Sequence, residues 1–394
     1  MFTSITCLFL GSVIIGSLMP IGKMSDMKML SVIFKRNNFL RGDKSQPKFN
    51  GKNNEDHYVE YVYSIPLGLT VGEGLVNAIG AAFEKPVKVL SEGGRIFIRI
   101  YFEKLPEIIP YSNVPIRKSA KWLMPIGYGL DGWLWHDLDR DAVHMNVSGA
   151  TRQGKTVFLK NLITYLCEHK TDYVKFHLID MKGGLEFGRY ENLRQVEGVA
   201  SNIEEAEQML ERIRLDIDKK MKFFKRRGFN NIVNTPIRTR HVIIIDEAAE
   251  LTPDKHTLPK LKESMQNCQD TMSHIARVAG ALGYRLVFCT QYATADTLPR
   301  QVKQNSDAKI AFKLPTGTAS RVAIDEDGAQ YLPNAGRAIY KTHERETVQV
   351  PLLDDKEMME RLQPFMKEVS ELDAPKDYSV PETDGSNIIE FGKA

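Results

Sequence analysis

The sequence predicts an α/β protein in which a small α/β unit precedes a larger three-layer α/β/α domain. From about residue 141 onward, short apolar runs alternate with stretches that carry apolar side chains at helical spacing, as is typical of parallel βαβ units. The run HVIIIDE, which begins at His241, has four consecutive branched apolar residues, which indicates a strand buried on both faces. We therefore expect the functional loops at the carboxyl ends of such strands.

Length and composition set broad limits on the function. The chain has 394 residues, enough for two or three domains, and its 42% hydrophobic and 26% charged residues are ordinary for a globular protein. Its 53 basic and 50 acidic residues leave a net charge of +3, so nucleic-acid binding would need a local basic patch. The four cysteines are scattered, which argues against a disulfide framework and a zinc site, and a reducing cytosolic setting fits the bulk of the chain.

The N-terminus has the character of a membrane anchor. Residues 2–22 contain no charged side chain and are long enough for a helix to cross about 30 Å of hydrocarbon. Six basic residues follow between Lys23 and Lys44, which favours a cytoplasmic location for the remainder of the chain. A cleaved signal peptide is the main alternative, although a basic leader and a small-residue cleavage site are missing, and a buried core helix is another. We expect residues 1–22 to be a single transmembrane anchor in the cell membrane.

A linker and a small α/β unit are expected next. Residues 23–56 are predicted to be a basic juxtamembrane linker, because residues 37–56 are polar and have no apolar period. Residues 57–140 are predicted to hold the small α/β unit and its connection onward. Within it, HYVEYVYSIP alternates like a strand, LTVGEGLVNAIGAAF has helical spacing, and VKVLSEGGRIFIRIYF suggests two strands around a turn.

The larger domain is expected over residues 141–350. Strands are predicted at MNVSG, VKFHLID, HVIIIDE, RLVFCTQ, AKIAFKL and GRAIYKT, and helices at TVFLKNLITYLCEH and at about residues 202–227 and 257–282. Residues 351–394 are predicted to be an acidic C-terminal tail with a short amphipathic stretch that Pro364 interrupts.

A phosphate-binding loop is predicted between the first of these strands and the first helix. The run GATRQGKT fits the pattern G-x-x-x-x-G-K-[ST] and has the required strand before it and helix after it. Backbone N–H groups of such a loop point at phosphate oxygens, and the helix N-terminus adds its dipole. Lys155 would reach the β and γ phosphates of a bound nucleotide, and Thr156 would offer its hydroxyl to Mg²⁺. The candidate nucleotide-binding residues are Gly149, Ala150, Thr151, Arg152, Gln153, Gly154, Lys155 and Thr156; the alternative is a glycine-rich turn with a surface lysine.

An acidic pair supplies the other half of the predicted site. Asp246 follows the buried strand and can hold Mg²⁺, since hard oxygen ligands suit this ion. Glu247 comes next and is the candidate general base for the attacking water. Gln291 ends the strand RLVFCTQ and is a candidate sensor of the γ-phosphate, and Asp180 and Lys182 at another strand tip are given a supporting role. Helix N-terminal charge and strand capping are the structural alternatives.

Six ordered blocks give the chain a family resemblance. SGATRQGKTVFLKNL, LIDMKGGLEF, KKMKFFKRRGFNNI, IIIDEAAEL, IARVAGALGYRLVFCTQ and AKIAFKLPTGTASRVAIDEDGAQYLPNAGRAIY stand in the order of the FtsK/SpoIIIE motor domain. Over about residues 57–350 the chain resembles most the conjugation coupling ATPases of that family, the TcpA-like and ConQ/YdcQ-like proteins. The resemblance implies a RecA-like P-loop ATPase that forms a hexamer and acts on DNA, with ATP and Mg²⁺ as cofactors.

The resemblance also assigns roles to single residues. Lys155 and Thr156 would bind the nucleotide and Mg²⁺, Asp246 and Glu247 would be the metal-associated and catalytic acids, and Gln291 would be the sensor. Arg321, in SRVAIDEDGA, and Arg277 are candidates for a charge donated to a neighbouring subunit, with a surface ion pair as the alternative. The following basic residues are candidates for DNA contact or for a solvated face: Lys219, Lys220, Lys222, Lys225, Arg226, Arg227, Arg238, Arg240, Lys255, Lys260 and Lys262.

Three functions remain open at this stage. The favoured one is a membrane-anchored, ATP-driven DNA translocase that couples DNA to a channel during conjugation and meets a relaxase. Only about 44 residues follow residue 350, too few for the winged-helix reader of chromosome translocases, so we expect movement that the DNA sequence does not direct. The alternatives are an ATPase for protein secretion and a nucleotide-dependent structural component of a membrane complex. Strandedness of the DNA, direction and ring size do not follow from the sequence.

Overall fold

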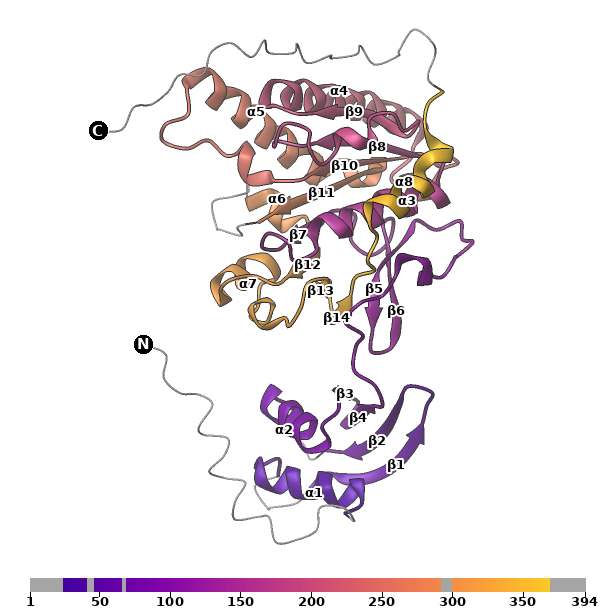
Figure 1. The fold of residues 1–394 in the computed structure, drawn as a ribbon, viewed down its shortest axis with the longest axis vertical. Helices are drawn as coiled ribbons and strands as arrows, with labels where there is room; N and C mark the ends of the chain where they lie inside the picture. Colours follow the sequence, from indigo (N-terminus) through magenta and orange to yellow (C-terminus); the bar gives the residue numbers. More distant parts are fainter. Residues whose placement is uncertain (1–23, 41–45, 66–68, 292–299, 369–394) are drawn as a thin grey trace, which may run out of the picture. The chain divides into compact units, whose positions relative to one another are not determined.

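The structure is a computed structural model that describes residues 24–40, 46–65, 69–291 and 300–368 (Figure 1). These residues divide into two compact units. The first unit contains the described residues up to Asp137, Ser148–Phe158 and Lys309–Leu352, and the second contains Leu138–Val147, Leu159–Ala308 and the described residues from Leu353 onward. The expected membrane anchor, residues 1–22, lies outside the described residues. Within them, every helix is too short or too polar to span a bilayer.

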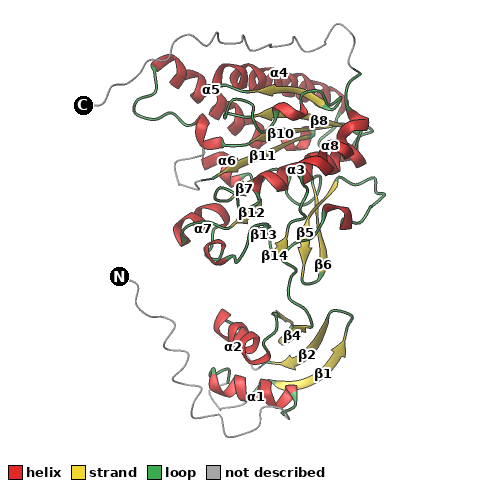
Figure 2. Cartoon of the chain, viewed as in Figure 1, coloured by secondary structure: helices red, strands yellow, loops and turns green. Residues whose placement is uncertain are grey.

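The first unit begins with a four-stranded antiparallel sheet in the order β1-β2-β4-β3 (Figure 2). Its strands are β1 (Lys48–Asn54), β2 (Tyr58–Ser64), β3 (Val87–Glu92) and β4 (Arg95–Tyr101), and its helices are α1 (Asp26–Arg36) and α2 (Glu73–Phe83). Alternate residues of β4, Ile96, Ile98 and Ile100, are buried in a core that also contains residues of α1 and α2. The period of two along β4 therefore decides which face of this sheet the helices cover.

The prediction of a linker over residues 23–56 is wrong. This segment contains α1 and β1, and Leu30, Ile33 and Phe34 of α1 are buried in the core of the four-stranded sheet. Apart from Phe49 and Gly51, the residues of β1 are polar. They form a strand because β1 lies at the edge of the sheet and is held by its backbone pairing with β2, and almost every side chain is exposed. An edge strand of this kind needs no apolar alternation, and composition alone therefore suggested a linker. The strand, helix and hairpin expected over residues 57–103 are confirmed as β2, α2 and β3–β4.

Five neighbouring strands of the ten-stranded sheet belong mainly to the first unit, in the order β6-β5-β14-β13-β12. They are β5 (Leu123–Gly129), β6 (Gly132–Asp137), β12 (Ala308–Phe312), β13 (Arg337–Lys341) and β14 (Arg345–Gln349), and helix α7 (Gly317–Ile324) follows β12. All four of these pairings are antiparallel, whereas the sequence predicted a parallel sheet. The difference arises because short turns join β5 to β6 and β13 to β14, and such turns can connect only antiparallel strands.

The second unit contains the parallel strands β8 to β11 and most of β7, in the sheet order β7-β11-β10-β8-β9. Their bounds are β7 (Met145–Ser148), β8 (Val174–Ile179), β9 (Val196–Ala200), β10 (Arg240–Ile245) and β11 (Tyr284–Thr290). Strands β8, β9, β10 and β11 pair in parallel, with Ile245 opposite Ile179 on one side and Phe288 on the other. The predicted strands VKFHLI, HVIII and RLVFCT are therefore confirmed, and their carboxyl ends meet at one edge.

The second unit also contains helices, and its strand β10 is buried on both faces. The helices are α3 (Lys155–His169), whose first turn belongs to the first unit, α4 (Ile203–Arg227), α5 (Pro259–His274), α6 (Arg300–Gln304) and α8 (Asp355–Leu362). Ile243 and Ile245 lie in a core with residues of α4 and α5. Val242 and Ile244, which alternate with them, are also completely buried. Both faces are thus covered, as a three-layer α/β/α arrangement requires.

Local signals explain the length of α4, the helix expected at residues 202–227. Asn202 caps its first turn by accepting a hydrogen bond from the Glu205 amide, and Gly228 ends it in the left-handed conformation. Acidic residues stand in the first turn and Lys225, Arg226 and Arg227 in the last, which suits the helix dipole.

Part of the predicted tail is a docked helix. In α8, Asp355 pairs with Lys160 and Arg189, and Arg361 pairs with Glu168 at 3.0 Å. Residues 369–394 lie outside the described residues.

Candidate nucleotide-binding site

The predicted phosphate loop, residues 149–156, is fastened to the antiparallel strands of the first unit. The Ala150 amide donates a hydrogen bond to the Lys313 carbonyl at 3.0 Å, and the Gly336 amide donates to the Gln153 carbonyl at 2.8 Å. Thr151 and Arg152 are exposed at the tip of the loop, whereas Lys155 is buried at the start of α3. The strand before the loop and the helix after it are those that the motif requires.

Two glycines of the loop have no room for a side chain. A Cβ on Gly149 would lie 2.7 Å from the Phe312 Cβ, and a Cβ on Gly154 would lie 2.8 Å from the Phe312 Cε1. Gly154 also has a φ of 123°, which side chains rarely permit. The loop backbone therefore packs directly on the ring and Cβ of Phe312, and the motif glycines are explained by this contact. Arg152 has a φ of 63°, a left-handed conformation that is costly for a residue with a Cβ.

The acidic pair belongs to the second unit and follows β10. Asp246 is 2% exposed and Glu247 is 4% exposed, and the Asp246 amide donates to the Ile179 carbonyl of β8 at 3.0 Å. On the other side of β10, the backbone N–H of Gln291 donates a hydrogen bond to Glu247 Oε2 at 3.0 Å. The strand order β11-β10-β8 explains this grouping, because the carboxyl ends of three adjacent parallel strands meet here.

Lys182 forms an ion pair with Asp246. Its Nζ lies 3.1 Å from Asp246 Oδ2, and its side chain is 38% exposed. Burial disfavours the ammonium form, but the negative charges of Asp246 and Glu247 outweigh burial and raise the pKa of Lys182 above its ordinary value. Lys182 therefore carries its positive charge beside the acidic pair.

Asp180 organises the loop that carries Lys182. Its side chain is completely buried at the end of β8, and its carboxylate accepts hydrogen bonds from the amides of Lys182, Glu186 and Phe187 at 3.0, 2.7 and 3.1 Å. Three backbone donors satisfy a buried carboxylate without a cation. The sequence assigned Asp180 and Lys182 a supporting role in common, and the structure gives them different contacts: Asp180 holds the loop, and Lys182 contacts the acidic pair.

The two candidates for a donated arginine lie in different units. Arg321, on α7 of the first unit, is exposed, and its Nη1 donates to both carboxylate oxygens of Asp327 at 2.8 Å. Arg277 is exposed on a π-helical turn, Ile275–Ala279, that continues α5 in the second unit. The surface ion pair considered as the alternative for Arg321 is thus present within the chain. A role of either residue toward a second subunit remains a prediction.

Two of the basic residues considered for DNA contact point into the protein. Arg240 is 3% exposed and forms a bidentate pair with Asp139 at 2.8 Å, and Arg285 pairs with the same carboxylate. Lys220 lies over the Tyr284 ring at 5.1 Å, and burial lowers its pKa to about 8. Arg240 is therefore corrected from a DNA surface to the interior, whereas Lys220 is half-buried against the Tyr284 ring. Lys219, Lys222, Lys225, Arg226, Arg227 and Arg238 are exposed.

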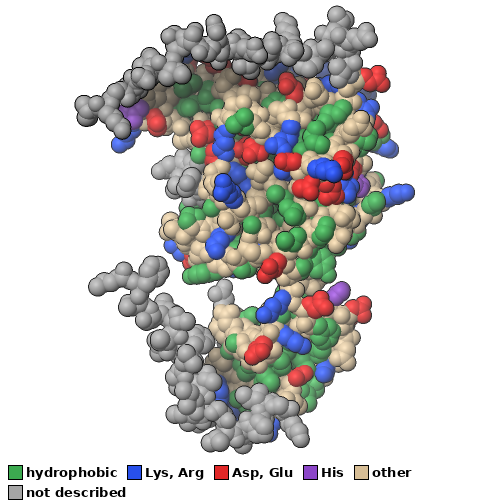
Figure 3. Space-filling view, in the orientation of Figure 1, with side chains coloured by type: hydrophobic (Ala, Val, Ile, Leu, Met, Phe, Trp, Pro, Cys, Tyr) green, Lys and Arg blue, Asp and Glu red, His purple; other side chains and the backbone are tan. Residues whose placement is uncertain are grey.

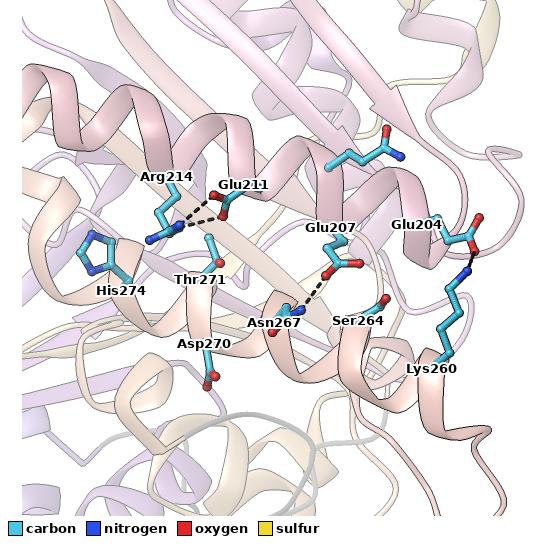
Figure 4. A pocket seen from close by; sticks show the side chains of 11 residues that line it. Glu204, Glu207, Glu211, Arg214, Lys260, Ser264, Asn267, Asp270, Thr271 and His274 are labelled. Carbon is cyan, nitrogen blue, oxygen red and sulfur yellow. Dashed lines mark hydrogen bonds and ion pairs between the residues drawn. The ribbon is translucent and has the colours of Figure 1, made fainter.

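A groove of about 930 Å³ between α4 and α5 has the wrong charge for a phosphate (Figure 4). Its acidic side chains are Glu204, Glu207, Glu211 and Asp270, and Figure 4 shows Glu211 paired with Arg214 and Glu204 facing Lys260. Lys260, which the sequence suggested for DNA contact, lies 3.8 Å from Glu204. Four carboxylates against two cations leave this groove unsuited to a nucleotide or a DNA backbone.

The structure thus brings part of the predicted site together. Asp246, Glu247 and Gln291 lie at one edge of the parallel strands, and Lys182 joins them. Gly149, Gly154, Lys155 and Thr156 belong to the first unit and lie on a loop of the predicted type. Among the described residues, no group of three or more His, Cys, Asp or Glu side chains could hold a metal ion. A phosphate-bound Mg²⁺ needs no such group, since it is held by one or two carboxylates and phosphate oxygens.

Comparison with known families decides the wider assignment. The sequence profile of the FtsK/SpoIIIE family matches residues 117–240, which include the phosphate loop and the loop of Asp180 and Lys182. The chain carries an FtsK/SpoIIIE domain. The family predicted from the six sequence blocks is therefore confirmed.

Curated relatives extend the FtsK/SpoIIIE match beyond this segment. The chain is 26% identical over 286 residues to the DNA translocase FtsK of Lactococcus lactis subsp. lactis, an alignment that covers 67% of this chain and 36% of the relative. It is also 26% identical over 250 residues to the DNA translocase FtsK of Streptococcus pyogenes serotype M6, over 58% of this chain and 30% of the relative. The chain thus spans about a third of the length of the curated relatives it matches.

Two solved structures share the fold. The pCW3 conjugation coupling protein TcpA, solved as a monomer with ATPγS, matches with a TM-score of 0.61 at 21% identity, over 84% of this chain and 97% of that one. The cytoplasmic domain of the type VII secretion ATPase EccC from Thermomonospora curvata matches with a TM-score of 0.54 at 20% identity, over 66% and 32%. At these identities the likeness is one of fold.

Proposed function

We propose that this protein is an FtsK-type ATPase that uses ATP and Mg²⁺ to move DNA, in the manner of a conjugation coupling protein. The observation that carries the proposal is the buried acidic pair, with Lys182 on Asp246 and the Gln291 amide on Glu247, at the carboxyl ends of three parallel strands. The FtsK/SpoIIIE domain and the DNA translocase relatives support it. The fold shared with TcpA supports the conjugative role.

The residues present fit ATP and Mg²⁺. Gly149 and Gly154 let the loop backbone lie close against Phe312. Lys155 supplies an ammonium group for the phosphates. Thr156 and Asp246 supply hard oxygen donors of the kind that Mg²⁺ prefers. When bound, MgATP supplies an activated γ-phosphoryl group. Lys155 would then bind the β and γ phosphates, and Asp246 and Thr156 would hold the metal. Glu247 would take the proton of the attacking water. The hydrogen bond from the Gln291 backbone N–H holds the Glu247 carboxylate in orientation.

DNA contact is proposed for exposed basic residues only. Lys222, Lys225 and Arg226, near the end of α4, are exposed, whereas Arg240 is buried and Lys220 is half-buried. On the face drawn in Figure 3, Lys and Arg side chains are interspersed with Asp and Glu. A grip on DNA would therefore rest on a local cluster of this kind rather than on the charge of the whole molecule, and it would weaken as salt is added.

Assembly and location are part of the proposal. Residues 1–22 would anchor the chain in the cell membrane with its motor in the cytoplasm, on account of their uncharged sequence and the basic residues that follow. A hexamer would allow Arg321 or Arg277 to face the nucleotide of a neighbour. A relaxase and a conjugation channel would be the partners. These features rest on the sequence and on the resemblance to coupling proteins.

The test is DNA-dependent ATP hydrolysis by the full-length chain in detergent. A soluble fragment should start no later than residue 24, because α1 is part of the first unit's core. We expect basal turnover that single-stranded or duplex DNA stimulates, and stimulation that declines with salt. The Lys155→Ala variant is the control for contaminating ATPases.

Two outcomes would point elsewhere. Basal turnover without stimulation by either form of DNA would favour the protein-secretion alternative, which the fold shared with EccC also accommodates. Nucleotide binding without any turnover would favour a structural component of a membrane complex. Both results would overturn the DNA-translocase proposal.

A further inference from the structure

Lys182 occupies a position that matters for the metal. Its Nζ lies 3.1 Å from Oδ2 of Asp246, the carboxylate proposed above for Mg²⁺. Asp246 is 2% exposed, and burying a charged carboxylate costs free energy that a paired cation offsets. In the protein without nucleotide, the Lys182 ammonium therefore supplies positive charge at the place where a divalent cation would otherwise supply it.

The loop of Lys182 is built to hold it there. Asp180 accepts three backbone hydrogen bonds, one of them from the Lys182 amide itself, and the Gly188 amide donates to the Gly184 carbonyl at 2.8 Å. The backbone at Lys182 is thus fixed relative to β8. Ile179 of β8 pairs with Ile245 of β10, and Asp180 and Asp246 are the residues that come directly after this pair on the two strands. The distance between the two loops is set by the sheet register.

The side chain of Lys182 is nevertheless able to leave. It is 38% exposed, whereas Asp180 and Asp246 are almost completely buried. A flexible four-carbon stem on a rigid loop can release its ammonium to solvent without moving the backbone. The arrangement therefore combines a fixed carboxylate with a removable cation.

We propose that Lys182 is a placeholder cation that holds Asp246 in position until Mg²⁺ arrives with the nucleotide and displaces it. This inference rests on the proposed function. Lys182 is a positioning residue, because it acts through Asp246. An ammonium and a divalent cation beside one carboxylate repel each other, so the lysine raises the Mg²⁺ concentration that nucleotide binding requires. The opposite role, in which Lys182 binds a phosphate, would lower that concentration.

The experiment is a Mg²⁺ titration of nucleotide binding by the full-length protein, with a fluorescent non-hydrolysable ATP analogue at fixed concentration. We expect Lys182→Gln to lower the half-saturating Mg²⁺ concentration by about threefold or more, since one competing charge is removed. Lys182→Arg keeps the charge and should resemble the wild type. The matched control is Lys175→Gln, because Lys175 lies on β8, the strand before the Lys182 loop, is 35% exposed and forms an ion pair with Glu197 of β9 at 2.8 Å.

Thermal unfolding in EDTA gives a second readout. We expect Lys182→Gln to unfold at a lower temperature than the wild type. The Mg²⁺ complex of the ATP analogue should raise the unfolding temperature of the variant by more than it raises that of the wild type. In an Asp246→Asn background, the same substitution should lower the EDTA unfolding temperature by less, because the carboxylate that pairs with Lys182 has lost its charge and only Glu247 and Glu186 still attract the ammonium.

The outcomes separate the inference from the proposed function. An unchanged or raised Mg²⁺ requirement in Lys182→Gln, with normal Mg²⁺-dependent binding by the wild type, would overturn the placeholder role and leave the ATPase proposal standing. Failure of the wild type to bind the analogue at any Mg²⁺ concentration would overturn both.

Discussion

The amide of Gln291 donates a hydrogen bond to Oε2 of Glu247 at 3.0 Å. This bond joins the ends of β11 and β10, two adjacent parallel strands, and it fixes the carboxylate proposed as the general base. A change in the backbone at Gln291 would therefore reorient Glu247 directly. The sequence predicts a sensor role for the Gln291 side chain. The structure adds a contact from the Gln291 backbone to Glu247, which the sequence does not reveal.

Glu247→Gln should bind ATP and hydrolyse it at least about 100-fold more slowly, because an amide cannot take the proton of water. The amide oxygen can still accept the hydrogen bond from Gln291, so the fold should be retained. ATP turnover and retention of labelled ATP measure the two effects. Glu250→Gln is the matched control, since Glu250 is exposed three residues later. Turnover near the wild-type rate in Glu247→Gln would exclude this residue as the base.

Lys155→Ala should reduce ATP-analogue affinity by about tenfold or more and abolish turnover, because the ammonium that faces the β and γ phosphates is removed. Fluorescence titration and phosphate release are the measurements. Lys160→Ala serves as control, since Lys160 lies on the same helix and pairs with Asp355. Hydrolysis near the wild-type rate in Lys155→Ala would contradict the phosphate-loop assignment.

Gly154→Ala should lose nucleotide binding and destabilise the protein by about 1–3 kcal/mol. The added Cβ would lie 2.8 Å from Phe312 in a backbone conformation with a φ of 123°. Chemical unfolding and analogue titration check both parts. Gly74→Ala is the control, because it has no neighbour within 4 Å and lies in α2, and it should be neutral or stabilising by about 1 kcal/mol. Equal effects of the two substitutions would show that the close approach to Phe312 is unimportant.

Local patterns predicted the phosphate loop and the acidic pair. The glycines, Lys155 and Thr156 stand at fixed offsets between a strand and a helix, and Asp246 follows four branched apolar residues. Each pattern needs only neighbours in sequence, so each could be placed without the fold. The antiparallel strands were harder, because β5 and β14 carry Pro, Gly or charged residues and their partners lie far away in sequence.

Pairings between distant charges could not be predicted. Lys182 and Asp246 are 64 residues apart, and only the adjacency of β8 and β10 brings them together. Arg240 and Lys220 belong to a basic run that reads as a surface, yet the ring of Tyr284 and the carboxylate of Asp139 draw them inward. A charged side chain is assigned to solvent by default, and a buried partner from another element overturns that default.

Acid should destabilise the protein in a range set by buried histidines. Burial lowers the pKa of His144 to about 3, and its Nδ1 accepts a hydrogen bond from the Leu286 amide at 3.0 Å. Between pH 6.5 and about 3 the unfolded chain binds a proton that the folded chain does not, so stability falls as pH falls through this range. His177 and His241, with pKa values lowered to about 4, add to the effect.

His144→Asn tests this dependence, because the Asn oxygen can accept from Leu286 but does not titrate. The slope of unfolding free energy against pH, measured with urea between pH 6 and 4.5, should decrease by up to about 1.4 kcal/mol per pH unit. An unchanged slope would mean that His144 titrates normally in the folded protein.

Asp139→Ala should destabilise the protein by about 3–5 kcal/mol, because it leaves two buried guanidinium groups, Arg240 and Arg285, without their shared carboxylate. Burial opposes ionisation of Asp139, but the two arginines hold its pKa below the ordinary value. The stability it contributes is therefore present above about pH 3.8 and is lost as pH falls further. Urea unfolding at pH 7 measures the loss. The control is Asp172→Ala, because Asp172 is exposed, and its free energy of unfolding should lie within about 0.5 kcal/mol of the wild type. A loss of less than about 1 kcal/mol would show that solvent compensates both arginines and that the cluster is not a buried unit.

Nucleotide affinity separates the role of this cluster from that of the acidic pair. Asp139, Arg240 and Arg285 join β10 and β11 away from the carboxyl ends of these strands. We therefore expect Asp139→Ala, measured at a low temperature at which it is folded, to bind nucleotide with unchanged affinity.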